Sequence, residues 1–506
     1  MKLALAYRLN ANWAPGAWVA HCGRETDQVH VAHGSAVVTN ADWFGEIVWA
    51  GPFAEASFDT TDIVFGSGGR LRGDSLTFVS SASTVDRLQV LERGPDVWIS
   101  NSLACLLAVT GCKPDRSYTG YARDFRTITR GLTHHRRVIP TTAEPVRLVY
   151  YSNLRWDGSR LGERMKPNPH RDLTTFERYR AFVDDALAQL AANMADSGRA
   201  APYEFLGTVS SGYDSPAAAA LARSHGLREV ITFTEARSGE PDSGARIADA
   251  LGLELRAFPR DAWKPNGHGP TTPEVLFLAS DGKGEDVFFR AAEPLLRGRV
   301  LITGFHGDKM WDAATTALSA DIVRGDQSGL SLTEYRLWAG FIHCPIAFLG
   351  VRQIRDVHAL SCSPELSPWD VGGDYTRPIC RRLVEDAGVP RGAFGQEKKA
   401  ASVHFYYHGG FLSPASTRAF LSWLGGVAGN DAQQDPELGR RTTAQAAMHW
   451  GANVMHRSAE RWPGAAGLFR RVGDRLAKYA DRERLFVHVF PWAIEQVIDR
   501  YQTVAV

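Results

Sequence analysis

Short apolar segments alternate with helical segments between residues 203 and 303 of this 506-residue chain. The strand-like segments are YEFLGTV, REVITFT, LELRAFP and GRVLITG, and between them lie PAAAALARSHG, SGARIADALG and EDVFFRAAEPLLRG. Such alternation is typical of βαβ units, in which helices cover both faces of a parallel sheet. The sequence therefore predicts an α/β fold whose parallel sheet lies in the middle of the chain.

The first 150 residues follow a different pattern. Apolar runs such as VHVAHGSAVVTN, SLTFVSS and DVWISNS are punctuated by Gly, Asn and Asp, which predicts a mainly antiparallel sheet region with few helices. One expected helix is NSLACLLAVTG. Between residues 155 and 175 the periodicity gives way to Pro, Gly and charge, so the predicted domains are 1–165 and 172–506.

Two further helical regions are expected in the second domain. Apolar residues recur at three- and four-residue intervals from Phe176 to Met194, which predicts an amphipathic helix. From about residue 320 onward the chain is expected to form a helical lobe beside the sheet. The charged stretch 469–484 is interpreted as a solvated helix face.

Charge and cysteine usage exclude several classes. The 57 basic and 56 acidic side chains leave a net charge of +1, so no global field would attract nucleic acid or an anionic membrane. Six cysteines without a CxxC pair argue against a zinc ribbon, an iron–sulfur site or a disulfide framework. The N-terminal MKLALAYRLNANW resembles a first strand more than a secretory signal. A cytoplasmic protein without a membrane span is expected.

A serine-rich turn follows the first strand of the parallel sheet and precedes a helix. It contains Ser210, Ser211, Gly212, Tyr213, Asp214 and Ser215, followed by Pro216. Backbone N–H groups and the positive end of the helix dipole favour a phosphate at such a place. Asp214 would repel that phosphate unless Mg²⁺ lay between them. The alternative is that Asp and Ser only cap the helix.

Several separated motifs resemble one family. SSGYDS resembles the SGGxDS loop of the PP-loop ATP pyrophosphatases, and most of the chain resembles their asparagine synthetase branch, which includes β-lactam synthetase, carbapenam synthetase and lasso-peptide cyclase. VWISNSLACLLA and ITRGLTHHRRVIP resemble the end of the family's N-terminal domain, LITGFHGDKMWD its second loop, and VPRGAFGQEKKAAS its lysine-bearing segment.

The resemblance implies two domains. The first is a mainly antiparallel, Ntn-hydrolase-like domain of glutaminase type. The second is a parallel-sheet PP-loop domain, similar to adenine nucleotide α-hydrolases, with a helical lobe.

The same resemblance implies ATP and Mg²⁺ as ligands. Asp214 and Asp308 would bind the metal, and Gly304 belongs to the second loop that faces the first across the nucleotide. Thr232 and Thr234, after the second strand, are expected near the adenine. A capping role is the alternative for Asp308.

Basic residues are expected to contact the phosphates. Lys399, in preference to Lys398, would neutralise charge on the leaving pyrophosphate. Lys309 replaces an acid of the family and would contact pyrophosphate. Three arginines offer further anion contacts or form a solvated helix face: Arg377, Arg381 and Arg382.

The chain departs from the family at two places. Lys2 stands where a working glutaminase needs cysteine, so the first domain is predicted to be degenerate. Phe305 replaces a tyrosine, and the stretch AGFIHCPIAFLG carries His343 where a glutamate on a later helix is expected. His306 or His343 would then serve in acid–base chemistry, unless each is an ordinary buried or surface group.

The sequence thus predicts an ATP-dependent, AMP-forming carbon–nitrogen ligase that adenylates a carboxylate and does not draw ammonia from glutamine. Its partners would be small-molecule or peptide carboxylates and amines. The alternatives are a PP-loop thiolation or RNA-modifying enzyme and a non-catalytic nucleotide-binding scaffold. His404 and His408 lack a third ligand in sequence, so no zinc site is expected. The oligomeric state stays open, a homodimer included.

Overall fold

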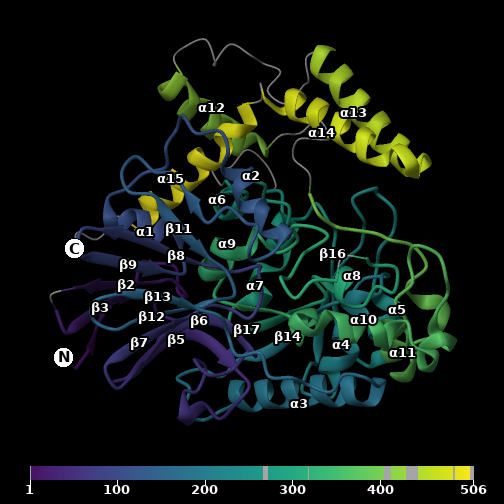
Figure 1. The fold of residues 1–506 in the computed structure, drawn as a ribbon, viewed down its shortest axis with the longest axis horizontal. Helices are drawn as coiled ribbons and strands as arrows, with labels where there is room; N and C mark the ends of the chain where they lie inside the picture. Colours follow the sequence, from purple (N-terminus) through teal and green to yellow (C-terminus); the bar gives the residue numbers. More distant parts are fainter. Residues whose placement is uncertain are drawn as a thin grey trace.

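The computed structural model describes residues 2–24, 26–265, 272–316, 318–403, 412–428, 443–482 and 485–501. In these residues the chain forms three sheets with helices around them (Figure 1). Two sheets of mainly antiparallel strands come from the first third of the chain, and a parallel sheet comes from the remainder. The predicted mixed α/β architecture is confirmed at this level.

The two mainly antiparallel sheets pack face to face. The first has the order β1-β3-β2-β9-β8-β11-β10 and the second β13-β12-β7-β6-β5-β4; β1 pairs in parallel with β3. Apolar side chains from both sheets, including Trp18, Ile99 and Phe78, form a shared core. The strands are β1 (Ala4–Leu9), β2 (Trp18–Gly23), β3 (Gln28–His33), β4 (Val38–Thr39), β5 (Trp43–Trp49), β6 (Val64–Arg72), β7 (Ser75–Val79), β8 (Leu88–Arg93), β9 (Asp96–Ser100), β10 (Val138–Ile139), β11 (Val146–Val149), β12 (Asn153–Trp156) and β13 (Leu161–Arg164).

A hairpin occupies the first part of the predicted linker. β12 and β13 pair antiparallel, and the Asp157 carboxylate closes their turn by accepting hydrogen bonds from the amides of Ser159 (2.9 Å) and Arg160 (2.8 Å). The Gly and charged residues at 157–160 therefore form a hairpin turn. The segment between β13 and the next helix has no regular element up to residue 175.

The parallel sheet has the order β16-β15-β14-β17-β18. Its strands are β14 (Glu204–Thr208), β15 (Glu229–Phe233), β16 (Glu254–Phe258), β17 (Arg299–Thr303) and β18 (Ile342–Pro345). The first four match the predicted strands, whereas β18 replaces the helix expected there. The chain adds strands outward from β14 to β16 and then returns to place β17 on the other side of β14, so the order of strand addition reverses between β14 and β17. Ligands of open α/β sheets bind at such a switch point, beyond the carboxyl ends of the strands.

Helices cover the sheets and form most of the described chain after residue 320, as expected. The predicted amphipathic helix is α3 (Phe176–Met194), which buries Phe176, Tyr179, Val183, Leu187, Leu190 and Met194 and runs beneath both sheet regions (Figure 1). The hairpin of α13 and α14 projects away from the sheets. The other helices are α1 (Leu103–Thr110), α2 (Tyr121–Arg126), α4 (Asp214–Arg223), α5 (Ala245–Leu251), α6 (Val275–Asp281), α7 (Glu293–Leu296), α8 (Gly307–Met310), α9 (Leu332–Ala339), α10 (Ile354–Ser361), α11 (Pro378–Asp386), α12 (Pro414–Ala428), α13 (Thr443–Arg461), α14 (Ala466–Arg482) and α15 (Val489–Tyr501).

The two parts of the chain share buried contacts. One apolar core includes Val19 and Leu106 from the first part together with Leu206 and Phe277 from the second. The Arg336 guanidinium on α9 is buried and donates to Glu46 Oε2 (2.8 Å) and Asp86 Oδ1 (2.8 Å). Separation of the two parts would leave these buried charges without their partners, so the ion pair opposes it.

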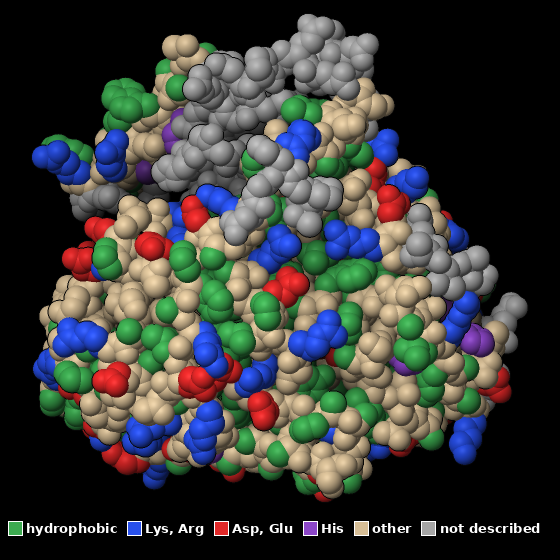
Figure 2. All heavy atoms as spheres, turned by 180° about the vertical axis from the view of Figure 1, so that it is seen from behind, with side chains coloured by type: hydrophobic (Ala, Val, Ile, Leu, Met, Phe, Trp, Pro, Cys, Tyr) green, Lys and Arg blue, Asp and Glu red, His purple; other side chains and the backbone are tan. Residues whose placement is uncertain are grey.

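The surface mixes both signs of charge. Figure 2 shows acidic and basic side chains interspersed over the described part of one face. Within the described residues, no helix combines the length and apolarity needed to cross a bilayer.

Candidate functional site

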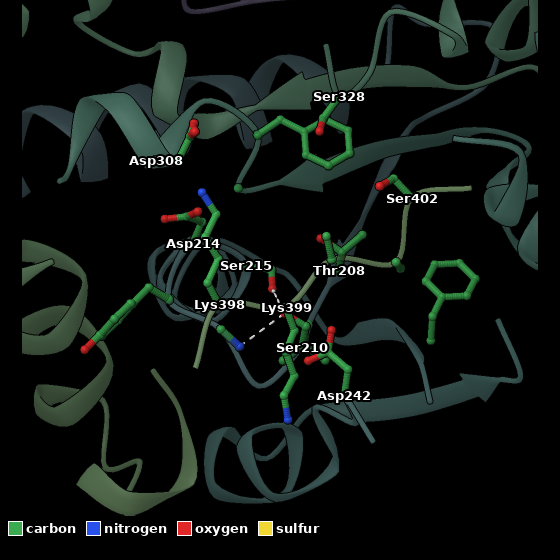
Figure 3. A pocket seen from close by; sticks show the side chains of 18 of the residues that line it. Thr208, Ser210, Asp214, Ser215, Asp242, Asp308, Ser328, Lys398, Lys399 and Ser402 are labelled. Carbon is green, nitrogen blue, oxygen red and sulfur yellow. Dashed lines mark hydrogen bonds between the residues drawn. The ribbon is translucent and has the colours of Figure 1, made fainter. Parts of the chain in front are cut away.

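A cavity of about 220 Å³ lies at the carboxyl ends of β14, β15 and β17, beside the switch point of the parallel sheet (Figure 3). Its walls combine a serine-rich loop, carboxylates, phenylalanines and a late segment with two lysines. The lining residues are Thr208, Val209, Ser210, Gly212, Tyr213, Asp214, Ser215, Ile231, Phe233, Asp242, Asp286, Phe288, Phe289, Gly304, Phe305, His306, Asp308, Asp326, Ser328, Tyr375, Arg377 and 398–402.

The serine-rich loop is held by its own side chains. Ser210 Oγ lies 3.0 Å from Ser215 Oγ and accepts a hydrogen bond from the Gly212 amide (3.3 Å). The amide and hydroxyl of Ser211 donate to Asp242 Oδ1 at 3.1 and 2.6 Å. The loop is thus preorganised at the N-terminus of α4, where the helix dipole favours an anion.

Asp214 is the first residue of α4 and forms an ion pair with Arg377. Burial raises the pKa of Asp214 to about 6; Arg377 opposes this shift, and the nearby Asp308 carboxylate adds to it. Asp214 Oδ1 is buried and has no hydrogen-bond partner among the described residues. A buried acceptor left in this way is suited to a cation or to a donor on a ligand.

Two glycines let the second loop approach the first. A Cβ on Gly304 would lie 2.3 Å from the Asp214 carbonyl carbon, and a Cβ on Gly307 would lie 2.6 Å from Asp214 Oδ1. Only residues without a side chain fit at these points. Because neither residue carries a Cβ, the second loop can lie against the first, and Asp308 at the start of α8 comes to the same side of the cavity as Asp214 (Figure 3).

The two carboxylates fit a magnesium ion that takes its other ligands from phosphates. In the described residues, no group of three or more His, Cys, Asp or Glu side chains is placed to hold a metal. Mg²⁺ is commonly bound by one or two carboxylates together with substrate phosphates. The unpartnered Oδ1 of Asp214 and the adjacent Asp308 meet that requirement, and the Arg377 contact occupies the other Asp214 oxygen.

Four residues predicted to contact the nucleotide do not line the cavity within the described part of the chain: Ser211, Thr232, Thr234 and Lys309. Ser211 faces Asp242. The Thr232 hydroxyl is buried and accepts a hydrogen bond from the Gly244 amide (3.0 Å). The remaining predicted loop residues, together with Gly304, His306 and Asp308, do line it.

The adjacent lysines point in different directions. In Figure 3 the Lys398 side chain extends toward Asp214, whereas that of Lys399 runs away from it. Lys399 Nζ donates to the Pro241 carbonyl (3.0 Å) and lies 3.6 Å from a Glu397 oxygen. The geometry therefore favours Lys398 for contact with an anion bound near Asp214, in contrast to the sequence-based preference for Lys399.

The two histidines are buried and neutral. Burial lowers the pKa of both His306 and His343 to about 3. His343 lies on β18, and its Nε2 is 2.8 Å from Thr303 Oγ1. His306 has a φ of 76°, stacks on Phe348 and has no hydrogen-bond partner for either ring nitrogen among the described residues. His404 and His408 lie outside the described residues.

The three arginines at the start of α11, of which Arg377 is the N-cap residue, do not form a solvated face. Arg377 reaches Asp214, and Arg381 donates to the Tyr213 hydroxyl. Both are buried. Arg382, on the following position, pairs with Glu177 (2.9 Å) and Glu365 (2.7 Å). Arg377 and Arg381 therefore hold two residues of the serine-rich loop, and Arg377 also lines the cavity.

Several cavity residues were missed from the sequence, notably Asp242, Asp286, Asp326 and Ser328. Asp242 follows β15 in the stretch EPDSG, and a polar turn after a parallel strand could have indicated it. The other three come from loops with no such signal.

A search of protein families finds none that matches this chain, and no curated protein matches its sequence.

Proposed function

We propose that this protein is an ATP-dependent, AMP-forming carbon–nitrogen ligase. The observation that carries the proposal is the meeting of the serine-rich loop, Asp214 and Asp308 around one cavity at the switch point of a parallel sheet. A loop at a helix N-terminus and two carboxylates are what a magnesium nucleotide requires. The finer fold follows the same proposal: an Ntn-hydrolase-like domain within 1–165 and a PP-loop domain within 172–506.

The residues have distinct roles in the proposed reaction. A substrate carboxylate attacks the α-phosphorus of ATP, pyrophosphate leaves, and an amine then displaces AMP from the acyl adenylate to give an amide. The loop amides and Lys398 stabilise charge on the phosphate oxygens, as preorganised donors do in a site that excludes water. Mg²⁺, held by Asp214 and Asp308, would screen the leaving pyrophosphate.

The substrates we propose are a small-molecule or peptide carboxylate and an amine, since Lys2 removes the cysteine that glutamine hydrolysis needs. No nucleic acid or membrane is part of the proposal. The net charge of +1 and the mixed charges of Figure 2 support this choice.

The test is carboxylate-dependent exchange of labelled pyrophosphate into ATP, with a panel of carboxylic acids, N-acyl amino acids and short peptides. Asp308→Asn should reduce exchange about 100-fold or more, because one charge near the phosphates is lost. Asp312→Asn is the matched control, as Asp312 lies on the same segment and accepts its hydrogen bond from the Ala314 amide (2.9 Å). Equal exchange in both variants would contradict the proposal.

A second candidate function is a non-catalytic nucleotide-binding scaffold. The Arg377 ion pair favours it, because a guanidinium already neutralises the carboxylate that would bind the metal. Binding of Mg·ATP without exchange for any carboxylate would support the scaffold.

A further inference from the structure

Part of the cavity wall is aromatic and acidic. Asp286 directly precedes a 3-10 helix, η3 (Val287–Ala292), which contributes Phe288 and Phe289, while Phe305 follows β17. The Phe288 and Phe289 ring centroids are 4.7 Å apart, and those of Phe289 and Phe305 are 6.3 Å apart at an interplanar angle of 86°. The three rings therefore form one continuous apolar surface beside a carboxylate.

The Asp286 carboxylate is fixed through one oxygen only. Its Oδ2 accepts hydrogen bonds from Ser331 Oγ (2.6 Å) and the Gly329 amide (2.9 Å), and the side chain is 2% exposed. No described residue donates to Oδ1, and Asp286 lines the cavity. One oxygen is thus positioned by the protein, and the other is left for a ligand.

Gly329 connects this carboxylate to the aromatic wall. Its φ is +87°, and a Cβ there would lie 3.1 Å from Phe305 Cδ2 and 3.3 Å from His343 Cε1. Gly329 therefore lies between the Asp286 carboxylate, to which its amide donates, and the side chains of Phe305 and His343. Phe305 has no proton to exchange, and His343 is engaged with Thr303.

A second observation indicates a polar ligand in the same cavity. His306 lines it, is 3% exposed, and has two buried ring nitrogens without a hydrogen-bond partner in the described residues. Buried polar atoms of this kind are rare unless a ligand or water satisfies them. The cavity is therefore built to receive polar groups beyond the phosphates.

The charges around Asp286 keep its proton affinity high. Burial raises the pKa of Asp286 to about 7, and the Asp281 and Glu285 carboxylates add to this, whereas the Ser331 and Gly329 hydrogen bonds oppose it. The buried Arg324 guanidinium also faces this group, but it lies 3.6 Å from an Asp326 oxygen. His306 and His343 are neutral. A base that works near neutral pH needs this proton affinity.

We propose that Asp286 is the general base for the second half of the reaction, and that the nucleophile is a primary amine whose apolar part lies against Phe288, Phe289 and Phe305. The proposal rests on the ligase function proposed above. The amine nitrogen forms a bond to the acyl carbon, and the bond from that carbon to the AMP oxygen breaks. The proton lost by the nitrogen passes to Asp286 Oδ1, and the products are the amide and AMP.

Two nucleophiles separate this role from a structural one. Hydroxylamine is largely unprotonated at neutral pH and is reactive enough to trap acyl adenylates without catalysis, although its nitrogen also loses a proton. Benzylamine is largely an ammonium ion at this pH and depends on a base to free its nitrogen for attack. With the carboxylic acid that gives the strongest pyrophosphate exchange, Asp286→Asn should reduce benzylamide formation about 100-fold or more, the usual contribution of general base catalysis. Its pyrophosphate exchange and hydroxamate formation should fall far less than its benzylamide formation, because neither of them depends on the base.

Asp281→Asn controls for the loss of a buried carboxylate. Because Asp281 raises the pKa of Asp286, the variants are compared above pH 7, where Asp286 is deprotonated with or without Asp281. Asp281 is buried like Asp286, accepts from the Lys283 and Gly284 amides (2.8 and 3.0 Å), and does not line the cavity in the described chain. If removing a buried carboxylate destabilises the fold, both variants should lose pyrophosphate exchange and amide formation together. A selective loss of benzylamide formation should appear only in Asp286→Asn.

A pH profile of the unchanged protein needs no variant. Because the base must be deprotonated, benzylamide formation should rise through a midpoint near pH 7, the pKa of Asp286, and hydroxamate formation should lack that step.

Three outcomes would overturn parts of the proposal. Equal benzylamide formation in Asp286→Asn and in the unchanged protein would overturn the role of Asp286 as the base. Hydroxamate without any benzylamide in the unchanged protein would overturn the amine class. Absence of carboxylate-dependent exchange would overturn the ligase function itself, and the base with it.

Discussion

Gly304 tests most directly whether the two loops meet as described. In Gly304→Ala the new methyl group would lie 2.3 Å from the Asp214 carbonyl carbon and 2.5 Å from its oxygen. These are backbone atoms at the start of a helix, so they cannot rotate away as a flexible side chain would. Overpacking a tight site costs about 1–3 kcal/mol, and we expect the upper end here.

The same clash should displace the serine-rich loop. Because a shift of about 1 Å in a binding group can cost about 100-fold in rate, pyrophosphate exchange should fall by about that factor. Urea unfolding measures the loss of stability, and equilibrium dialysis with Mg²⁺ and a labelled, non-hydrolysable ATP analogue measures binding.

Gly392→Ala serves as the control, since a Cβ there meets no heavy atom within 4 Å. This substitution should leave both the stability to urea and the binding of the nucleotide nearly unchanged. The reasoning is refuted if Gly304→Ala unfolds at the same urea concentration as Gly392→Ala and binds the nucleotide equally well.

Three further predictions concern charged groups. Arg336→Met leaves Glu46 and Asp86 buried without their partner and should lower the free energy of unfolding, measured in urea, by about 3–5 kcal/mol. Adding Glu46→Gln should restore part of this loss. A loss under about 1 kcal/mol would contradict the described ion pair. Burial lowers the pKa of Lys166 to about 7 from 10.5, so between these pH values the unfolded chain binds more protons and stability should rise with pH; in Lys166→Met this rise should disappear, and its persistence in thermal melts would assign it to another group. Lys398→Ala should reduce pyrophosphate exchange more than Lys399→Ala, and the reverse order would favour the choice made from sequence.

The sequence predicts the parts of the fold that depend on local periodicity. The strands β14 to β17 and helix α3 follow from apolar spacing, which the buried residues of α3 reflect directly. β18 has only four residues, and so short an apolar run does not distinguish a strand from a helix. The hairpin of β12 and β13 was hidden for a related reason, because its Asp157 turn has the composition of a linker.

The residues of the candidate site were likewise only partly predictable from the sequence. The serine-rich loop is recognisable because its residues are consecutive and follow a strand. Asp286 and Arg377 reach the cavity from segments remote in sequence, and only the folded arrangement brings them to it. The direction of the two lysines also depends on contacts that lie elsewhere, such as the Pro241 carbonyl that binds Lys399.

The apolar core that joins Val19 and Leu106 to Leu206 and Phe277 constrains how this chain can be shortened. A fragment that ends after the antiparallel sheets, or one that begins at the parallel sheet, would expose part of this apolar core to solvent. Exposed apolar surface of this kind favours aggregation. The shared packing is therefore by itself a reason to keep the first 165 residues, whether or not they perform any chemistry.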